Sequence, residues 1–100
     1  MPLQRIVKMT FRAEEIPTFL TLFAEVSPKI RAFPGCEGLR LLRSREPANV
    51  LFTYSWWTGE EALHAYRQSE LFRATWVKTK ALFADRPQAW STDLIADLKD

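Results

Sequence analysis

The sequence predicts an α+β fold in which helices cover one face of a four-stranded antiparallel sheet. Two segments, 13–30 and 58–84, carry apolar residues at the steps of three and four that are typical of amphipathic helices. Four other segments have the composition or alternation of strands. These segments follow the order β-α-β-β-α-β, the split βαβ arrangement of the ferredoxin-like fold. Right-handed crossovers would place both long helices on one face.

Length and composition favour one small domain with more apolar surface than it can bury. The 100 residues suffice for a single domain, which we assign to residues 1–100. Hydrophobic residues make up 47% of the chain and aromatic residues 13%, so part of the apolar surface is expected to face a partner or a ligand. The net charge of +2 and the mixing of acidic with basic residues argue against a nucleic-acid surface.

The sequence also shows no sign of secretion or membrane insertion. Its single cysteine, Cys36, cannot form an internal disulfide, which favours an intracellular location. No apolar run follows the N-terminal residues, and no segment is long enough to span a membrane. We therefore expect a soluble, cytoplasmic protein that binds neither membranes nor nucleic acids.

The first strand is expected at residues 3–11, where apolar side chains lie on both faces. A helix is expected over 13–30. Pro17 is compatible with its first turn, whereas Pro28 lacks an amide and clashes with the preceding turn. Ser27 followed by Pro28 therefore predicts a kink or a new helix start.

The second and third strands are expected to form a hairpin. A turn at Phe33-Pro34-Gly35 precedes a strand at 36–43. A short loop at 45–49, which contains Pro47, leads into a strand at 50–57. This third strand is rich in aromatic and β-branched residues, so we place it in the middle of the sheet.

A helix is predicted directly after this central strand. Thr58 and Glu61 have the spacing of a capping box, in which both side chains accept hydrogen bonds from amides at the helix start. Trp57 and Ala62 would then form a hydrophobic staple. Trp57 is thus expected at a sharp corner between strand and helix, where we expect the functional site.

The C-terminal third is expected to contain a helix with an interruption, followed by a strand. Ser69 is a good N-cap, so a second helical run is expected over 70–84. Pro87 ends this run. Residues 90–98, a mixture of apolar and polar residues, are interpreted as the last strand, and a solvated tail follows.

The central strand carries large apolar groups on both faces, although helices cover only one. Phe52, Tyr54 and Trp56 share one face. If that face were bare, it would expose more apolar surface than monomers usually tolerate. We therefore predict an isologous homodimer in which two sheets pack face to face through these three residues.

Aromatic and hydroxyl side chains near the corner are candidates for a ligand site, and each has a structural alternative. Trp57 could stack on a flat ligand or serve as a core residue. Tyr66 could present its hydroxyl to the same cleft or reach solvent from the core. Thr53 and Ser55 could hydrogen-bond a substrate oxygen or simply leave room for a helix. Trp76 lies in an apolar stripe, which favours the core over a ligand contact.

The ionisable residues offer few candidates for catalysis. His64 is the only histidine and should point away from the inward side of its helix, which favours a surface position. Arg5 and Lys8 could stabilise a phenolate, although basic residues at sheet edges are usually solvated. Cys36 is assigned to the core without a chemical role. One histidine and one cysteine cannot build a metal cluster or a nucleophile triad, so no metal site is predicted.

A short run of residues carries a family resemblance. The sequence resembles the antibiotic biosynthesis monooxygenase domain at Tyr54-Ser55-Trp56-Trp57-Thr58-Gly59-Glu60-Glu61-Ala62-Leu63, at Tyr66 and at Ser69-Glu70-Leu71-Phe72. The turn Phe33-Pro34-Gly35-Cys36 is also similar to that family. The resemblance implies a dimeric α+β barrel. For some members it implies oxidation of electron-rich aromatic or polyketide substrates by molecular oxygen, without metal or flavin.

A related branch of the family degrades haem, and its residues differ from those of this sequence. The axial histidine of that branch corresponds to Trp76, four residues after Phe72, and tryptophan cannot ligate iron. A tryptophan of that branch corresponds to Tyr66, a position where many family members have histidine. Its strand asparagine corresponds to Val7. The resemblance therefore argues against haem turnover.

Two functions from different classes remain. The first is a cofactor-independent monooxygenase for a small aromatic or quinol-type substrate, with Tyr66, Ser55, Thr53 and Arg5 as catalytic candidates, none of them an obvious base. The candidate substrate-binding residues are Trp57, Tyr66, Phe72, Trp76, Val7, Thr53 and Ser55. The second is a non-catalytic dimeric module that binds an apolar small molecule. An RNA-binding function is disfavoured, because the aromatic strand face is needed for the dimer.

Overall fold

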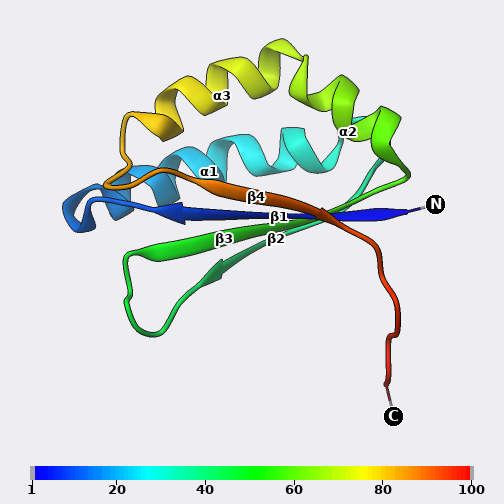
Figure 1. The fold of residues 1–100 in the computed structure, drawn as a ribbon. Helices are drawn as coiled ribbons and strands as arrows, with labels where there is room; N and C mark the ends of the chain where they lie inside the picture. The colour runs from blue at the N-terminus through cyan, green and yellow to red at the C-terminus, as the bar shows by residue number, and fades with distance from the viewer. Residues whose placement is uncertain (1, 100) are drawn as a thin grey trace.

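The computed structural model describes residues 2–99 and shows a four-stranded antiparallel sheet with helices on one face (Figure 1). The elements are β1 (Leu3–Thr10), the short 3₁₀ helix η1 (Ala13–Glu15), α1 (Ile16–Arg31), β2 (Cys36–Arg43), β3 (Val50–Trp57), α2 (Glu60–Arg67), α3 (Glu70–Lys80) and β4 (Gln88–Thr92). The strand order is β2-β3-β1-β4, so β3 and β1 lie in the middle of the sheet, as in ferredoxin-like folds. Within the described residues, no helix combines the length and apolarity needed to cross a membrane.

The register of the sheet assigns the side chains of β3 to two faces. β3 pairs antiparallel with β1, so that Ser55 lies opposite Arg5 and Thr53 opposite Val7. These four residues face the helices, because they line the space between the helices and the sheet. Side chains alternate along a strand, so the intervening residues of β3 face away from the helices. These are Phe52, Tyr54 and Trp56.

The core lies between sheet and helices in two clusters of buried side chains. The first consists of Met9, Phe11, Ile16, Phe19, Leu51 and Leu82. The second, beside α2, consists of Leu3, Cys36, Trp57 and Leu63. Cys36 is therefore a core residue, as predicted, and its Sγ lies 3.6 Å from the carbonyl oxygen of Gly38.

The predicted helix start at Ser27 is wrong. α1 continues through Ser27 and Pro28 and ends at Arg31. Pro28 lies in the last turn, so it disturbs only the end of the hydrogen-bonded helix. Ile30, two residues further on, is buried against the sheet layer, and this burial favours continuation of the helix.

The predicted capping box at Thr58 and Glu61 is also wrong. The N-cap of α2 is Gly59, and no side chain caps this helix. The backbone N–H of Thr58 instead donates to the carbonyl oxygen of Gly35 at 2.9 Å. This bond ties the end of β3 to the turn before β2, which leaves Thr58 outside the helix.

Trp57 is consequently a strand residue and not half of a hydrophobic staple. Because α2 begins one residue later than predicted, Trp57 and Ala62 do not occupy the staple positions. Trp57 is 1% exposed within the second cluster, and Ala62 packs against the same cluster. The expected corner between strand and helix is therefore present, with Trp57 buried beneath it.

The predicted interruption between the two C-terminal helices is confirmed. The Oγ of Ser69 accepts a hydrogen bond from the backbone N–H of Phe72 at 3.1 Å and caps α3. α3 ends at Lys80, four residues before the predicted end.

The last strand is shorter than predicted and begins earlier. β4 covers Gln88–Thr92, and the remainder of the predicted strand 90–98 is not in the sheet. Figure 1 shows this tail leaving the sheet on the side opposite the helices. Because it pairs with no strand of the described chain, three of its apolar side chains are exposed: Leu94, Ile95 and Leu98.

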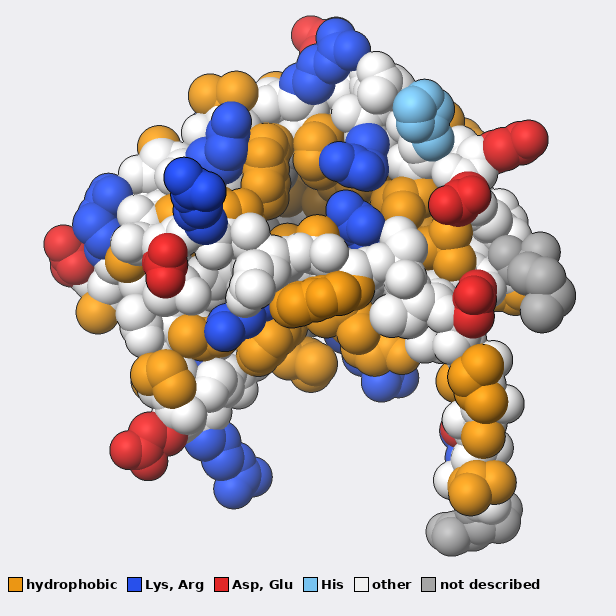
Figure 2. All heavy atoms as spheres, in the orientation of Figure 1, with side chains coloured by type: hydrophobic (Ala, Val, Ile, Leu, Met, Phe, Trp, Pro, Cys, Tyr) orange, Lys and Arg blue, Asp and Glu red, His pale blue; other side chains and the backbone are white. Residues whose placement is uncertain are grey.

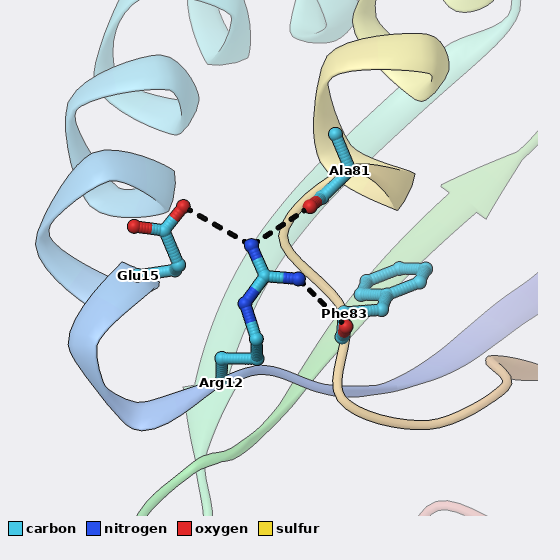
Figure 3. A network of polar contacts seen from close by, with 4 residues as sticks. All are labelled: Arg12, Glu15, Ala81 and Phe83. Carbon is cyan, nitrogen blue, oxygen red and sulfur yellow. Dashed lines mark hydrogen bonds and ion pairs between the residues drawn. The ribbon is translucent and has the colours of Figure 1, made fainter.

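Arg12 holds the end of α3 against the start of the first helical segment (Figure 3). Its Nη2 lies 3.0 Å from the carbonyl oxygen of Ala81 and 3.4 Å from Oε2 of Glu15, and its Nη1 lies 3.3 Å from the carbonyl oxygen of Phe83. Carbonyls after a helix lack partners within the helix, and a guanidinium satisfies them. The contact fixes the position of α3 above the sheet.

Candidate functional site

A cavity of about 250 Å³ lies between the helices and the sheet. Figure 2 shows it as a hollow with hydrophobic side chains inside and basic side chains around its rim. An apolar cavity of about 150 Å³ is sufficient for benzene. The larger volume of this cavity therefore suits a ligand of one or two aromatic rings.

With the exception of Lys8, the cavity brings together the catalytic and substrate-binding candidates predicted from the sequence. The sheet contributes Arg5, Val7, Thr53, Ser55 and Trp57 to its wall. The helices contribute Tyr66, Phe72 and Trp76. Residues from β1, β3, α2 and α3 therefore meet at one site. The register of the sheet aligns the residues of β1 and β3, and the inward faces of α2 and α3 lie above them.

Four aromatic side chains form a continuous wall of this cavity. The Trp57 and Tyr66 rings are stacked, with centroids 5.0 Å apart and an interplanar angle of 28°. Tyr66 meets Phe72 edge-on at 5.2 Å, and Phe72 stacks on Trp76 at 5.7 Å. Trp76 thus both packs in the apolar layer and faces the cavity. Such a wall offers flat apolar surfaces to an aromatic ligand.

The two hydroxyl residues of β3 differ in their surroundings. Ser55 is buried, and its Oγ accepts a hydrogen bond from Nε1 of Trp57 at 2.9 Å. This bond satisfies the buried indole N–H and fixes the orientation of the Trp57 ring. Thr53, two residues before Ser55 on the same face of β3, is half-buried and lines the cavity. Ser55 therefore positions Trp57, whereas Thr53 is the free hydroxyl of the sheet wall.

Tyr66 places a phenol at the cavity wall. Within residues 2–99, its hydroxyl forms no hydrogen bond to another side chain or carbonyl. Burial raises the pKa of Tyr66 to about 12, with a further contribution from Cys36. The phenol is therefore protonated at neutral pH and acts as a hydrogen-bond donor, not as a base.

The pKa of Tyr66 predicts how stability depends on pH. Below pH 10 the phenol is protonated in both the folded and the unfolded chain. Between pH 10 and about 12 the unfolded chain loses this proton while the folded chain keeps it, so the free energy of unfolding should fall by roughly 2–3 kcal/mol. Urea unfolding across this range should show the fall, and Tyr66→Phe should remove it. A Tyr54→Phe chain keeps Tyr66 and should keep the fall; equal slopes in both variants would contradict the assignment.

Arg5 is not at a sheet edge, contrary to the solvated position considered from the sequence. It lies in β1, an inner strand, and lines the cavity. Its Nη1 donates to Oγ of Ser91 on β4 at 3.0 Å. Lys8, the other basic candidate, lies on the outward face of β1 and does not line the cavity. Of the two, only Arg5 is placed to stabilise an anion there.

Arg67 is a cavity residue that the sequence reasoning missed. It follows Leu63 by four residues and therefore shares the inward face of α2 with Leu63 and Tyr66. This spacing is the feature of the sequence from which the inward position of Arg67 could have been predicted. His64 is exposed and lines only a shallow depression on the outer surface, as its predicted surface position requires.

The sequence profile of the antibiotic biosynthesis monooxygenase family matches residues 2–77. The chain belongs to the antibiotic biosynthesis monooxygenase family. The matched region contains β1, α1, β2, β3, α2 and most of α3, and with them every cavity residue predicted from the sequence. A comparison with curated proteins found no match.

Solved structures with this fold include several bearing the family name. The chain superimposes on Rv0793 from Mycobacterium tuberculosis with a TM-score of 0.88 and 16% identity, covering 99% of this chain and 100% of that one. A variant of SnoaB, a cofactor-independent oxygenase from Streptomyces nogalater, gives a TM-score of 0.87 and 18% identity over 99% and 98% of the two chains. A crystal structure of an antibiotic biosynthesis monooxygenase gives 0.87 and 20% over 94% and 99%. At these identities the likeness shows the fold.

The site of this antibiotic biosynthesis monooxygenase family member contains few groups able to hold a metal. Among residues 2–99, no group of three or more histidine, cysteine, aspartate or glutamate side chains is placed to bind a metal ion. Trp76, which the resemblance described above aligns with the axial histidine of the haem-degrading branch, lines the cavity wall.

Proposed function

We propose that this chain is a cofactor-independent monooxygenase that oxidises a small aromatic or quinol-type substrate with molecular oxygen. The observation that carries the proposal is the apolar cavity of about 250 Å³, walled by stacked aromatic rings and holding the free hydroxyl of Tyr66. Membership of the monooxygenase family supports it. The volume favours substrates of one or two rings.

The reaction needs a substrate that can itself reduce oxygen. An ionised phenol gives one electron to O₂, and the resulting phenoxyl radical and superoxide combine to form a carbon–oxygen bond at the ring. Cleavage of the oxygen–oxygen bond then leaves a quinone oxygen on the substrate and releases the other oxygen as water. The protein contributes a dry cavity, orientation of the ring and stabilisation of the anion.

Tyr66 is the residue we assign to stabilise the negative oxygen. Its raised pKa keeps the proton on the phenol, so it donates a hydrogen bond to an oxyanion. Thr53 provides a second hydroxyl on the opposite wall. Trp57, held by Ser55, supports the Tyr66 ring from behind, and the partly exposed rings of Tyr66, Phe72 and Trp76 provide the surface for the substrate ring.

Oxygen uptake tests this proposal. Hydroquinones of one and two rings should consume oxygen faster with the protein than in buffer alone. Tyr66→Phe should lower kcat by roughly 10²–10³-fold, the loss typical of an oxyanion donor. Tyr54→Phe removes a hydroxyl from the outward face and should leave kcat unchanged. Equal rates for the two variants would remove Tyr66 from the mechanism.

A second function, a non-catalytic module that binds an apolar small molecule, is favoured by one observation. Among residues 2–99, no histidine or carboxylate side chain lines the cavity, so none of them is placed to act as a base. Absence of oxygen uptake above buffer, together with quenching of tryptophan fluorescence by the same hydroquinones, would favour this module over the enzyme.

We further propose that the chain is a homodimer through the outward face of its sheet. Figure 2 shows hydrophobic side chains gathered beneath the sheet, on the side without helices. On this face Leu42 is 47% and Trp90 44% exposed, beside Phe52, Tyr54 and Trp56. The tail after β4 lies on the same side and adds further exposed apolar residues. A second copy would cover this surface.

A further inference from the structure

Two arginines line one end of the cavity. Arg5 reaches it from β1 and Arg67 from α2. Arg67 is exposed and also lines the neighbouring surface depression, and Arg5 contacts Ser91 in an exposed hydrogen bond. These positions place both guanidinium groups where the apolar cavity opens to solvent.

Neither guanidinium is neutralised by a carboxylate. Among residues 2–99, the ion pairs are Arg12 with Glu15 and Lys99 with Asp97. Glu60 and Glu61, the acidic residues of α2, line the outer depression together with Arg67, but they form no ion pair with it and do not line the cavity. Of the five N–H donors of Arg5, one is used by Ser91. The cavity opening therefore carries two positive charges with unused donors.

The two positive charges lie close enough to repel each other. Burial lowers the pKa of Arg5, and the positive charge of Arg67 lowers it further. Two arginines held at one opening are unfavourable in the absence of a counter-charge. An anion bound between them would remove this cost and gain charge-assisted hydrogen bonds.

The lack of a base at the cavity wall also favours a ligand that is already an anion. In the described part of the chain, no histidine or carboxylate side chain lines the cavity, and Tyr66 keeps its proton at neutral pH. A neutral phenol that entered the cavity would have to lose its proton to water, because among residues 2–99 no histidine or carboxylate lines the wall to accept it. A ligand that already carries its negative charge in solution needs no such group.

We infer that the cavity takes an aromatic anion, whose ring lies against the aromatic wall of Tyr66, Phe72 and Trp76 and whose negatively charged oxygen is bound by Arg5 and Arg67. The inference rests on the proposed function for the identity of this ligand as the substrate. Two kinds of ligand fit this description, an aromatic carboxylate and a phenolate. Both place a charged oxygen at the opening and an apolar ring inside.

Matched probes test the inference through binding alone. 2-Naphthoate carries a carboxylate, and 2-naphthamide is its neutral counterpart of nearly the same shape. Quenching of tryptophan fluorescence, at a pH where the carboxylate is fully ionised, should show that 2-naphthoate binds about tenfold tighter or more. Its affinity should fall with added salt, whereas that of 2-naphthamide should not. 2-Naphthol, measured below and above its own pKa, tests the phenolate source in the same way.

Substitutions then assign the charge to the two arginines. Arg5→Gln and Arg67→Gln should each weaken binding of 2-naphthoate about tenfold or more and leave 2-naphthamide within about twofold. Arg45→Gln, in the exposed β2–β3 loop, is the matched control and should change neither affinity. The inference is supported if either anion binds more tightly than its neutral form and loses affinity in Arg5→Gln and Arg67→Gln. The anion that binds more tightly shows whether the ligand is a carboxylate or a phenolate. Equal binding of anionic and neutral probes, or no binding of either, overturns it. Because no turnover is measured, these results are independent of the oxygen-uptake assay.

Discussion

Replacing Trp57 by alanine is expected to lower the free energy of unfolding by about 3–5 kcal/mol, the range for truncation of a buried tryptophan. Its side chain is 1% exposed, joins the second core cluster and stacks on Tyr66. The space left by the indole would open into the existing cavity, so neighbouring atoms cannot close it. For a domain whose whole stability is of order 5–15 kcal/mol, such a chain would be close to unfolding at room temperature.

Chemical unfolding of three further variants separates packing from hydrogen bonding at this position. Trp57→Phe keeps a ring but loses the Nε1 hydrogen bond to Ser55, so its loss should be smaller than that of Trp57→Ala. Ser55→Ala leaves the indole N–H without its acceptor and should cost about 1–3 kcal/mol. Val77→Ala, at a side chain that is 65% exposed on α3, is the control and should change little. A loss below 1 kcal/mol for Trp57→Ala would contradict this assignment.

A charge on the outward face of the sheet is expected to convert a dimer into a monomer. Ile6 lies on the inner strand β1, opposite Tyr54 on one side and Trp90 on the other, and its side chain faces away from the helices. In the proposed dimer, Ile6→Glu would bury a carboxylate against an apolar surface, which costs several kcal/mol in each subunit. Sedimentation at micromolar concentration should show the native chain at twice the monomer mass and Ile6→Glu at the monomer mass.

Val77→Glu provides the control for this experiment. It adds the same charge on the exposed side of α3, away from the sheet, and should leave the dimer intact. Far-ultraviolet circular dichroism should show that both variants keep the secondary structure of the native chain. A native chain that sediments as a compact monomer would refute the dimer, whatever the variants do.

Much of the fold was predictable because the strongest signals in the sequence are local. The bounds of β2 and β3 match those expected from composition and turn residues, and Ser69 caps α3 as its position suggested. The site followed from the same pattern. Alternation along β3 separates Thr53, Ser55 and Trp57 from the outward residues, so the cavity wall could be assigned to one face before the structure was known.

The errors arose where tertiary contacts override a local signal. Pro28 is a helix breaker by itself, but the burial of Ile30 beyond it keeps α1 continuous. Thr58 has the side chain of a cap, but its backbone bonds to Gly35 in a distant turn. The pairing of β4 with β1 ends at Thr92, which composition alone does not reveal. Arg67 was missed because a basic residue on a helix is usually solvated, although its spacing from Leu63 places it on the inward face of α2.

The alternation along β3 has a consequence for how this gene can change. One face of the strand forms the ligand chamber, and the reverse face, offset by one residue, forms the surface assigned to assembly. Deletion or insertion of a single codon within β3 would exchange the two sets of side chains at once. Substitutions in this strand therefore alter one property at a time, whereas a change of its length by one residue should abolish both chamber and contact surface together.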